Sequence, residues 1–287
     1  MRKKFLFLSL VFFVIGVLLV FMKSSNDNLH KNEYFYPTEP LINLQIDHED
    51  TYIAISKNDI SGTNRWIPFF FSFEFDTDVS AEAIEELLNN RITSASLIND
   101  EGILFFSTDD LIWSVFKVGK NLYNPTLVVV PSVSEIVTDE IIKVSKIVLY
   151  EGNNPREYNL VNYLIETHET IYEDDICSAR ATIGTEIQEN LVARVHYGLY
   201  CESDTINSFE LIFPPEFANI QEYKIIDIEH SEYDATDHKE WEEKVITYVI
   251  DVHFAVPMKK TVFRPFIGVS NSVVSGRVIP ALPAYIN

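Results

Sequence analysis

Residues 66–75 read WIPFFFSFEF, and this stretch decides the fold class of the chain. Every second residue from Phe69 to Phe75 is a phenylalanine, whereas Ser72 and Glu74 occupy alternate positions. Because successive side chains of a β-strand point to opposite faces, this spacing predicts a strand with one aromatic and one polar face. We interpret the phenylalanines as part of a hydrophobic core rather than as an aromatic surface for a ligand.

Short apolar runs of the same kind recur on both sides of this stretch, among them LINLQID (41–47), GILFFS (102–107) and TLVVVP (126–131). Turn-forming clusters separate such runs at intervals of about 8–12 residues, a spacing typical of antiparallel sandwiches and barrels. Long helices do not alternate with the strands, which argues against a doubly wound α/β sheet. We therefore predict a mainly β fold of antiparallel, sandwich-like domains with immunoglobulin-like architecture.

One helix is expected between the strands. Ser80 is a good N-cap residue, and Ala81, Ile84, Leu87 and Leu88 follow it at helical spacing. The glutamates between them are expected to face solvent. The sequence predicts one or two such short helices in the whole chain.

The N-terminal run Phe5–Met22 (FLFLSLVFFVIGVLLVFM) has no charged residue and follows Arg2, Lys3 and Lys4. At 1.5 Å per residue it can cross most of a hydrocarbon core of about 30 Å. A cleaved signal peptide would have a shorter apolar region and a small-residue cleavage site, and a buried core helix would have a polar face. We favour an uncleaved, single-pass transmembrane signal anchor.

The basic residues before the anchor predict its orientation. The positive-inside rule places residues 1–4 in the cytoplasm and everything after the anchor outside it. Residues 23–40 are polar and end in prolines, so they are expected to form a tether. All 43 acidic residues follow Met22, and the net charge of the chain is −21. Such an acidic protein repels nucleic acid and would attract a basic partner.

The cluster Glu151–Pro155 is the strongest turn signal in the middle of the chain. It predicts a first β-sandwich-like domain over residues 41–155 and a second over residues 156–287. The second domain contains the only two cysteines, Cys177 and Cys201. If the flanking strands form a hairpin that turns near Glu189, the two cysteines face each other. An extracytoplasmic location permits a disulfide between them; the alternative is two buried free thiols.

Motifs of known enzymes are incomplete in this sequence. Ser114 and Lys117 match the S-x-x-K pattern of penicillin-binding proteins, but S-D-N and K-T-G are absent and the surrounding run alternates like a strand. The segment Gly268–Ser272 lacks the second glycine of a hydrolase G-x-S-x-G motif. Phosphate-binding and dinucleotide-binding glycine patterns are also missing from the sequence. No catalytic residue and no cofactor is therefore predicted.

An acidic connection over residues 230–243 contains the candidate metal ligands. Carboxylates in a loop can bind Ca²⁺ and imidazoles can bind Zn²⁺, but the spacing matches no defined site and the loop has no glycine. We interpret it as a solvated hairpin tip and predict no metal. The four candidate ligands are Asp234, Asp237, His238 and Glu240.

These observations predict a non-enzymatic binding or structural module of the bacterial cell envelope, anchored in the membrane and extracytoplasmic. The expected partner is a protein with a basic or cation-bridged surface that meets the loop 230–243. The alternative is an extracytoplasmic hydrolase whose site is assembled from residues distant in sequence.

Overall fold

The computed structural model describes most of the chain beyond residue 43, and this part is mainly β, as the sequence predicts. The predicted anchor Phe5–Met22 and the tether 23–40 lie outside the described residues. No helix in the described part is both long and apolar enough to cross a membrane. The described residues are 44–57, 65–75, 77–132, 140–170, 177–189, 191–201, 206–215, 217, 220–233, 243–257, 259–270, 275–279 and 283–286.

The phenylalanine-rich stretch forms β3 (Ile67–Glu74), and its predicted alternation is confirmed. Phe69, Phe71 and Phe73 are buried, whereas Glu74 is exposed. β3 lies in an antiparallel four-stranded sheet. The order of this sheet is β1 (Gln45–Ile46), β3, β7 (Leu122–Val129) and β6 (Leu111–Gly119).

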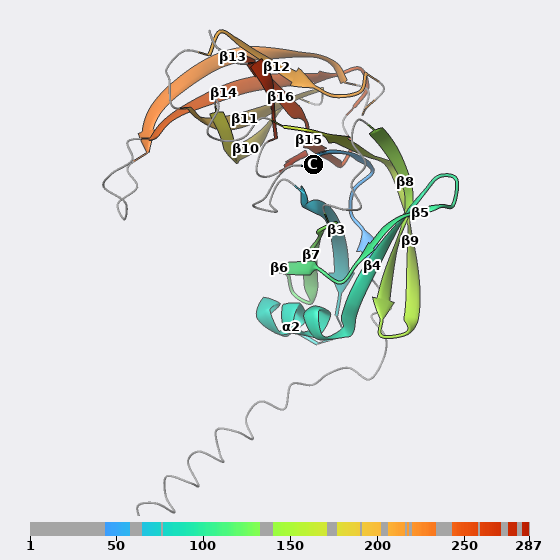
Figure 1. The fold of residues 1–287 in the computed structure, drawn as a ribbon. Coiled ribbons are helices and arrows are strands. Elements are labelled where there is room, and N and C mark those ends of the chain that lie inside the picture. The colour runs from blue at the N-terminus through green and yellow to red at the C-terminus, as the bar shows by residue number, and fades with distance from the viewer. Residues whose placement is uncertain are drawn as a thin grey trace, which may run out of the picture. The chain divides into compact units, whose positions relative to one another are not determined.

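The predicted helix is present as α2 (Ala81–Arg91). The Ser80 side chain accepts a hydrogen bond from the backbone N–H of Ala83, and this contact caps the first turn. Ile84, Leu87 and Leu88 form the buried face of the helix, which packs next to β6 (Figure 1). Helical periodicity in the sequence therefore identified both the start and the buried face of this element.

A seven-stranded sheet is mostly antiparallel, as the sequence predicts, but it contains two parallel pairs. β2 (Asp50–Ser56) lies between β15 and β9 and runs parallel to both, while the other neighbours are antiparallel. The strands beside β2 come from distant parts of the chain (Figure 1). The sheet order is β18 (Ala284–Ile286), β15 (Thr261–Arg264), β2, β9 (Asn154–His168), β8 (Glu140–Glu151), β4 (Ile92–Asn99) and β5 (Leu104–Thr108).

The predicted division between residues 155 and 156 falls inside β9, which forms a hairpin with β8. Gly152 has a φ of +59° in the turn of this hairpin, a conformation that favours glycine. The turn signal therefore marks the turn of a β-hairpin. Because β2 pairs directly with β9 and β15, one sheet contains strands from both predicted domains. Asn43–Asn287 forms one compact unit.

A first aromatic core lies between β3 and the seven-stranded sheet. The ring of Phe69 stacks on that of Tyr163 with centroids 5.0 Å apart, and Phe71 contacts Tyr158 at 5.6 Å. Trp113 on β6 lies 5.9 Å from Phe71. Full burial of each such side chain contributes about 1.5–3 kcal/mol, so these contacts fix β3 against β9.

The C-terminal strands form two further antiparallel sheets. Both were expected as β structure, and both lie in the same compact unit as the first strands. The larger has the order β10 (Cys177–Glu189), β11 (Val192–Cys201), β14 (Glu243–Phe254) and β13 (Ile220–Tyr233). The smaller has the order β12 (Ser208–Ile212), β16 (Phe266–Ser270) and β17 (Ser275–Val278).

A second core joins these sheets to the seven-stranded sheet. Tyr52 on β2 contacts Phe217 at 5.4 Å, and Phe217 stacks on Phe263 of β15 at 5.5 Å. Tyr248 and Ile250 of β14 belong to the same buried cluster. The seven-stranded sheet is thus covered by one core around Phe69 and by another around Phe217.

Candidate functional site

The acidic loop predicted as a metal-site candidate joins two paired strands. Tyr233 at the end of β13 pairs with Glu243 at the start of β14, as expected for a hairpin. Within the described part of the chain, no three His, Cys, Asp or Glu side chains lie close enough to hold a metal ion. The four candidate ligands, Asp234, Asp237, His238 and Glu240, lie outside the described residues.

Cys177 and Cys201 are direct cross-strand partners between β10 and β11, so the predicted register is confirmed. Directly opposed residues of an antiparallel pair have Cα atoms about 4.5–5.5 Å apart, within the range that a disulfide bridges. The last pair before the turn is Glu189 with Val192, and three register shifts separate it from the cysteines. The disulfide itself stays a prediction.

Ser114 and Lys117 lie on β6, three residues apart. Side chains at this spacing point to opposite faces of a strand, so the lysine amine cannot take a proton from the serine hydroxyl. Ser114 is exposed, while the Lys117 amine forms an ion pair with Asp78. The S-x-x-K match is therefore not a catalytic pair.

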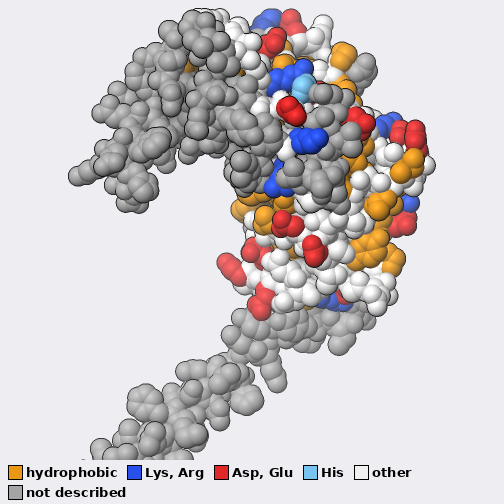
Figure 2. Space-filling view, in the orientation of Figure 1, with side chains coloured by type: hydrophobic (Ala, Val, Ile, Leu, Met, Phe, Trp, Pro, Cys, Tyr) orange, Lys and Arg blue, Asp and Glu red, His pale blue; other side chains and the backbone are white. Residues whose placement is uncertain are grey.

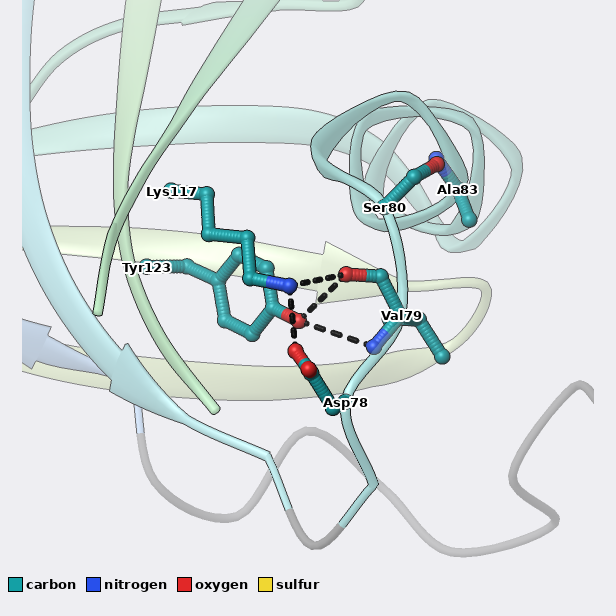
Figure 3. Close-up of polar contacts among 6 residues, drawn as sticks. All are labelled: Asp78, Val79, Ser80, Ala83, Lys117 and Tyr123. Carbon is teal, nitrogen blue, oxygen red and sulfur yellow. Dashed lines mark hydrogen bonds and ion pairs between the residues drawn. The ribbon is translucent and has the colours of Figure 1, made fainter. Parts of the chain in front are cut away.

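The contacts of Lys117 have a structural role instead. Its Nζ donates to the carbonyl oxygen of Val79 at 3.0 Å, and the Tyr123 hydroxyl donates to the same oxygen at 2.7 Å (Figure 3). The hydrogen bond to Lys117 lowers the pKa of Asp78, and the same bond raises the pKa of Lys117. Together these groups hold the segment before α2 in place, so that Ser80 can cap the helix.

A buried hydroxyl–imidazole pair lies at the start of β2. The Thr51 hydroxyl is 2.9 Å from Nδ1 of His48, and the imidazole contacts the rings of Phe69 and Tyr163. Burial lowers the pKa of His48 to about 4, although the charge of Asp47 opposes this shift. Such a pair resembles a nucleophile and its base, but Thr51 is fully buried and out of reach of a substrate. We therefore assign the pair to the core.

The neighbouring Asp50 is also buried and accepts a hydrogen bond of 2.7 Å from the Asn162 side-chain amide. Asn162 has a φ of +48° and lies in an irregularity of β9, where Val144 pairs with Tyr163. A positive φ in a residue other than glycine indicates local strain. The bond to Asp50 compensates for this strain and ties β9 to its parallel neighbour β2.

A third polar cluster connects three strands around a buried tyrosine. The Tyr52 hydroxyl donates to the Glu166 carboxylate at 2.6 Å, and Arg277 lies 3.7 Å from the other carboxylate oxygen. Burial, together with the negative charge of Glu166, raises the pKa of Tyr52. The Arg277 guanidinium also lies over the ring of Phe266. Because Tyr52 is fully buried, this cluster links β2, β9 and β17 rather than presenting a reactive group.

β13 presents the most distinctive surface feature. It ends the strand order of its sheet and pairs along its length with β14 (Figure 1). Ile220 and Tyr223 at its beginning pack against the second core. Further along, Ile225, Ile226 and Ile228 are 40%, 43% and 46% exposed. These isoleucines therefore expose apolar surface beside a strand edge that no other described strand covers.

Acidic residues flank the exposed Ile228 in sequence. Asp227 and Glu229 are both exposed and pair with β14 residues on the face opposite the second core. Ile228 pairs with Tyr248, a member of the second core, and so points to the face that carries this core. The only lysine of β13, Lys224, already forms an ion pair of 2.7 Å with Glu222. The exposed part of β13 therefore places Ile228 on one face of the sheet and Asp227 and Glu229 on the other.

Other exposed apolar side chains occur near β5, β8 and β9, on a side of the molecule where Figure 2 shows several hydrophobic side chains. They are Ile103, Leu104, Ile141 and Val161, each more than half exposed. Scattered apolar side chains of this kind are normal on protein surfaces. The edge strand β6 also exposes apolar side chains, namely Ile112, Phe116 and Val118. β13 differs because exposed acidic residues, Asp227 and Glu229, lie next to its exposed isoleucines.

No model of a known protein family matches the chain, and no curated protein is detectably similar to it in sequence. The choice of site therefore rests on this chain's own geometry. Analysis of the sequence did not single out the isoleucines of β13. The sequence feature that could have identified them is the segment Lys224–Glu229, in which Ile225 and Ile226 are adjacent and break the strict alternation of a strand.

Proposed function

We propose that this protein is a non-enzymatic, membrane-tethered module of the bacterial cell envelope that binds a protein partner through β13. The observation that carries the proposal is the exposure of Ile225, Ile226 and Ile228 on an edge strand, beside Asp227 and Glu229. Protein interfaces commonly combine an apolar centre with a polar rim. The adjoining loop 230–243 would extend this surface.

The net charge of −21 favours a basic partner. An acidic surface increases the rate at which a basic protein is captured and disfavours acidic competitors. Cations could bridge the acidic loop to a partner in the same way. The anchor Phe5–Met22 would hold the module at the outer face of the membrane, with residues 23–40 as a tether. Sandwich-like packing of the sheets would present β13 as a rigid binding edge.

The experiment that tests this function is crosslinking in intact cells that express the full-length protein. Ile228→Ser removes exposed apolar surface from β13 without changing the net charge. Ile112→Ser is the matched control, because Ile112 is 42% exposed on β6, an edge strand of another sheet. We expect the β13 variant to lose its crosslinked partner and the β6 variant to retain it. Equal yields from both variants would refute β13 as the binding surface.

The location is tested separately. Protease added to intact protoplasts should degrade the part of the protein that follows the anchor. Protection of this part, or a mature N-terminus near Lys23, would contradict an uncleaved anchor with the module outside the cytoplasm.

A further inference from the structure

We propose that the partner binds by adding a β-strand to the free edge of β13, and that the added segment alternates basic with apolar residues. This inference rests on the proposed binding function and specifies its mode and the chemistry of its partner. It is carried by the backbone geometry, the side-chain pattern and the charge of β13.

The backbone of β13 provides the first argument. The strand is 14 residues long and is paired on one side with β14 from Ile220↔Phe254 to Tyr233↔Glu243. Every second residue of such an edge strand directs its N–H and C=O groups away from its neighbour, where they can pair with another chain. Register shifts occur near Ile220 and near Ile225, whereas Asp227–Tyr233 pairs without interruption. An uninterrupted stretch of this size matches a typical strand in length.

The side-chain pattern provides the second argument. Asp227 and Glu229 lie on one face of the sheet, while Ile228 and His230 lie on the face that carries the second core. All four are exposed. Cross-strand neighbours on the same face interact directly, so opposite charges opposite each other stabilise a pair of strands. An added strand would therefore place basic side chains beside Asp227 and Glu229 and apolar side chains beside Ile228.

Charge also discriminates between occupants of this edge. If two copies of the protein paired antiparallel about Ile228, Asp227 of one copy would lie opposite Glu229 of the other. Like charges directly opposite each other destabilise a sheet. A segment rich in lysine or arginine relieves this repulsion, so β13 fits a basic strand better than it fits itself.

The test uses the full-length protein in nanodiscs of neutral lipid, which do not attract a cationic probe. The probe is a fluorescent peptide that alternates Lys with Val. The first control contains the same residues in two blocks, and the second has Glu in place of Lys. Two further peptides carry N-methyl groups on the Lys residues or on the Val residues, so that each loses the hydrogen-bond donors of one edge.

We expect the alternating peptide to bind and both sequence controls to bind at least about tenfold more weakly. One N-methylated peptide should lose binding and the other should retain it, because an added strand uses only one of its edges. Ile228→Ser and the double variant Asp227→Asn, Glu229→Gln should each weaken binding. Ile112→Ser should bind like the unmodified protein.

Equal binding of both N-methylated peptides would overturn strand addition. The proposed function would survive that result if crosslinking of the partner in cells still depended on Ile228. Loss of that crosslinking dependence would refute the proposed function itself. Self-association of the protein that Ile228→Ser abolishes would identify a second copy as the occupant and would also overturn the inference.

Discussion

Two buried tyrosines of this structure, Tyr163 and Tyr197, differ in whether the hydroxyl has a hydrogen-bond partner. Tyr163 and Tyr197 are both fully buried. The Tyr163 hydroxyl donates to the carbonyl oxygen of Pro68 at 2.9 Å, whereas the Tyr197 hydroxyl finds no hydrogen-bond partner among the described residues. Burial raises the pKa of both hydroxyls, so both stay protonated at neutral pH. Replacing each tyrosine with phenylalanine keeps the ring and removes only the hydroxyl.

The two substitutions should change stability in opposite directions. A buried polar group without a partner costs about 1–3 kcal/mol, so Tyr197→Phe should raise the free energy of unfolding by about 1 kcal/mol or more. Tyr163→Phe should lower it by about 1–2 kcal/mol, because the carbonyl oxygen of Pro68 loses its donor. The ring of residue 163 would still stack on Phe69, so the loss reports the hydrogen bond. The two variants should therefore differ by about 2–4 kcal/mol.

Urea denaturation followed by tryptophan fluorescence measures this difference. The slope of unfolding free energy against urea should be the same for all three proteins, because the surface exposed on unfolding hardly changes. The midpoint should rise for Tyr197→Phe and fall for Tyr163→Phe. A loss of stability in Tyr197→Phe that equals the loss in Tyr163→Phe would refute the interpretation of Tyr197 as an unsatisfied donor.

Three further predictions concern other parts of the fold. Gly268→Ala should cost about 1–3 kcal/mol in urea denaturation, since the new Cβ would lie 2.6 Å from Cγ of Glu210; an unchanged midpoint would contradict this. The pKa of His48 is about 4, below its value of about 6.5 when unfolded, so the protein should lose stability as the pH falls between these values. This loss of unfolding free energy should approach about 3 kcal/mol and be absent from His48→Phe. Equal pH profiles of stability for the two proteins would refute the prediction. Cys177 and Cys201 should resist alkylation in the unfolded, unreduced protein, whereas two reactive thiols would exclude the disulfide.

The sequence predicted local features of this fold well. The alternation in β3 and the helical spacing in α2 both report which side chains are buried, and burial follows directly from the period of each element. The strand register that places Cys177 opposite Cys201 was also predicted, although the assumed turn lay at Glu189 itself. The last pair is Glu189 with Val192, and the register shifts along β10 compensate for the displacement of the turn.

Long-range pairing could not be predicted in this way. β2 reads like the other short strands, and nothing in its own residues specifies parallel neighbours from β9 and β15. Parallel pairing is favoured where both faces of a sheet are buried. Here Tyr163 of β9 packs into the core on one face and Phe263 of β15 into the core on the other. The same limit applies to the candidate site. The exposure of Ile228 follows from the position of β13 beyond the second core, and strand periodicity contains no information about that position.

Amide hydrogen exchange of the full-length protein, with and without the peptide that alternates Lys and Val, tests most directly whether β13 is the binding edge. We expect alternate amides between Asp227 and His230 to exchange more slowly when the peptide is bound, because they become hydrogen-bonded. The amides of β6 (Leu111–Gly119), an edge strand of another sheet, should keep their rates. Unchanged exchange along β13, or equal slowing on β6, would contradict the assignment of β13 as the binding edge.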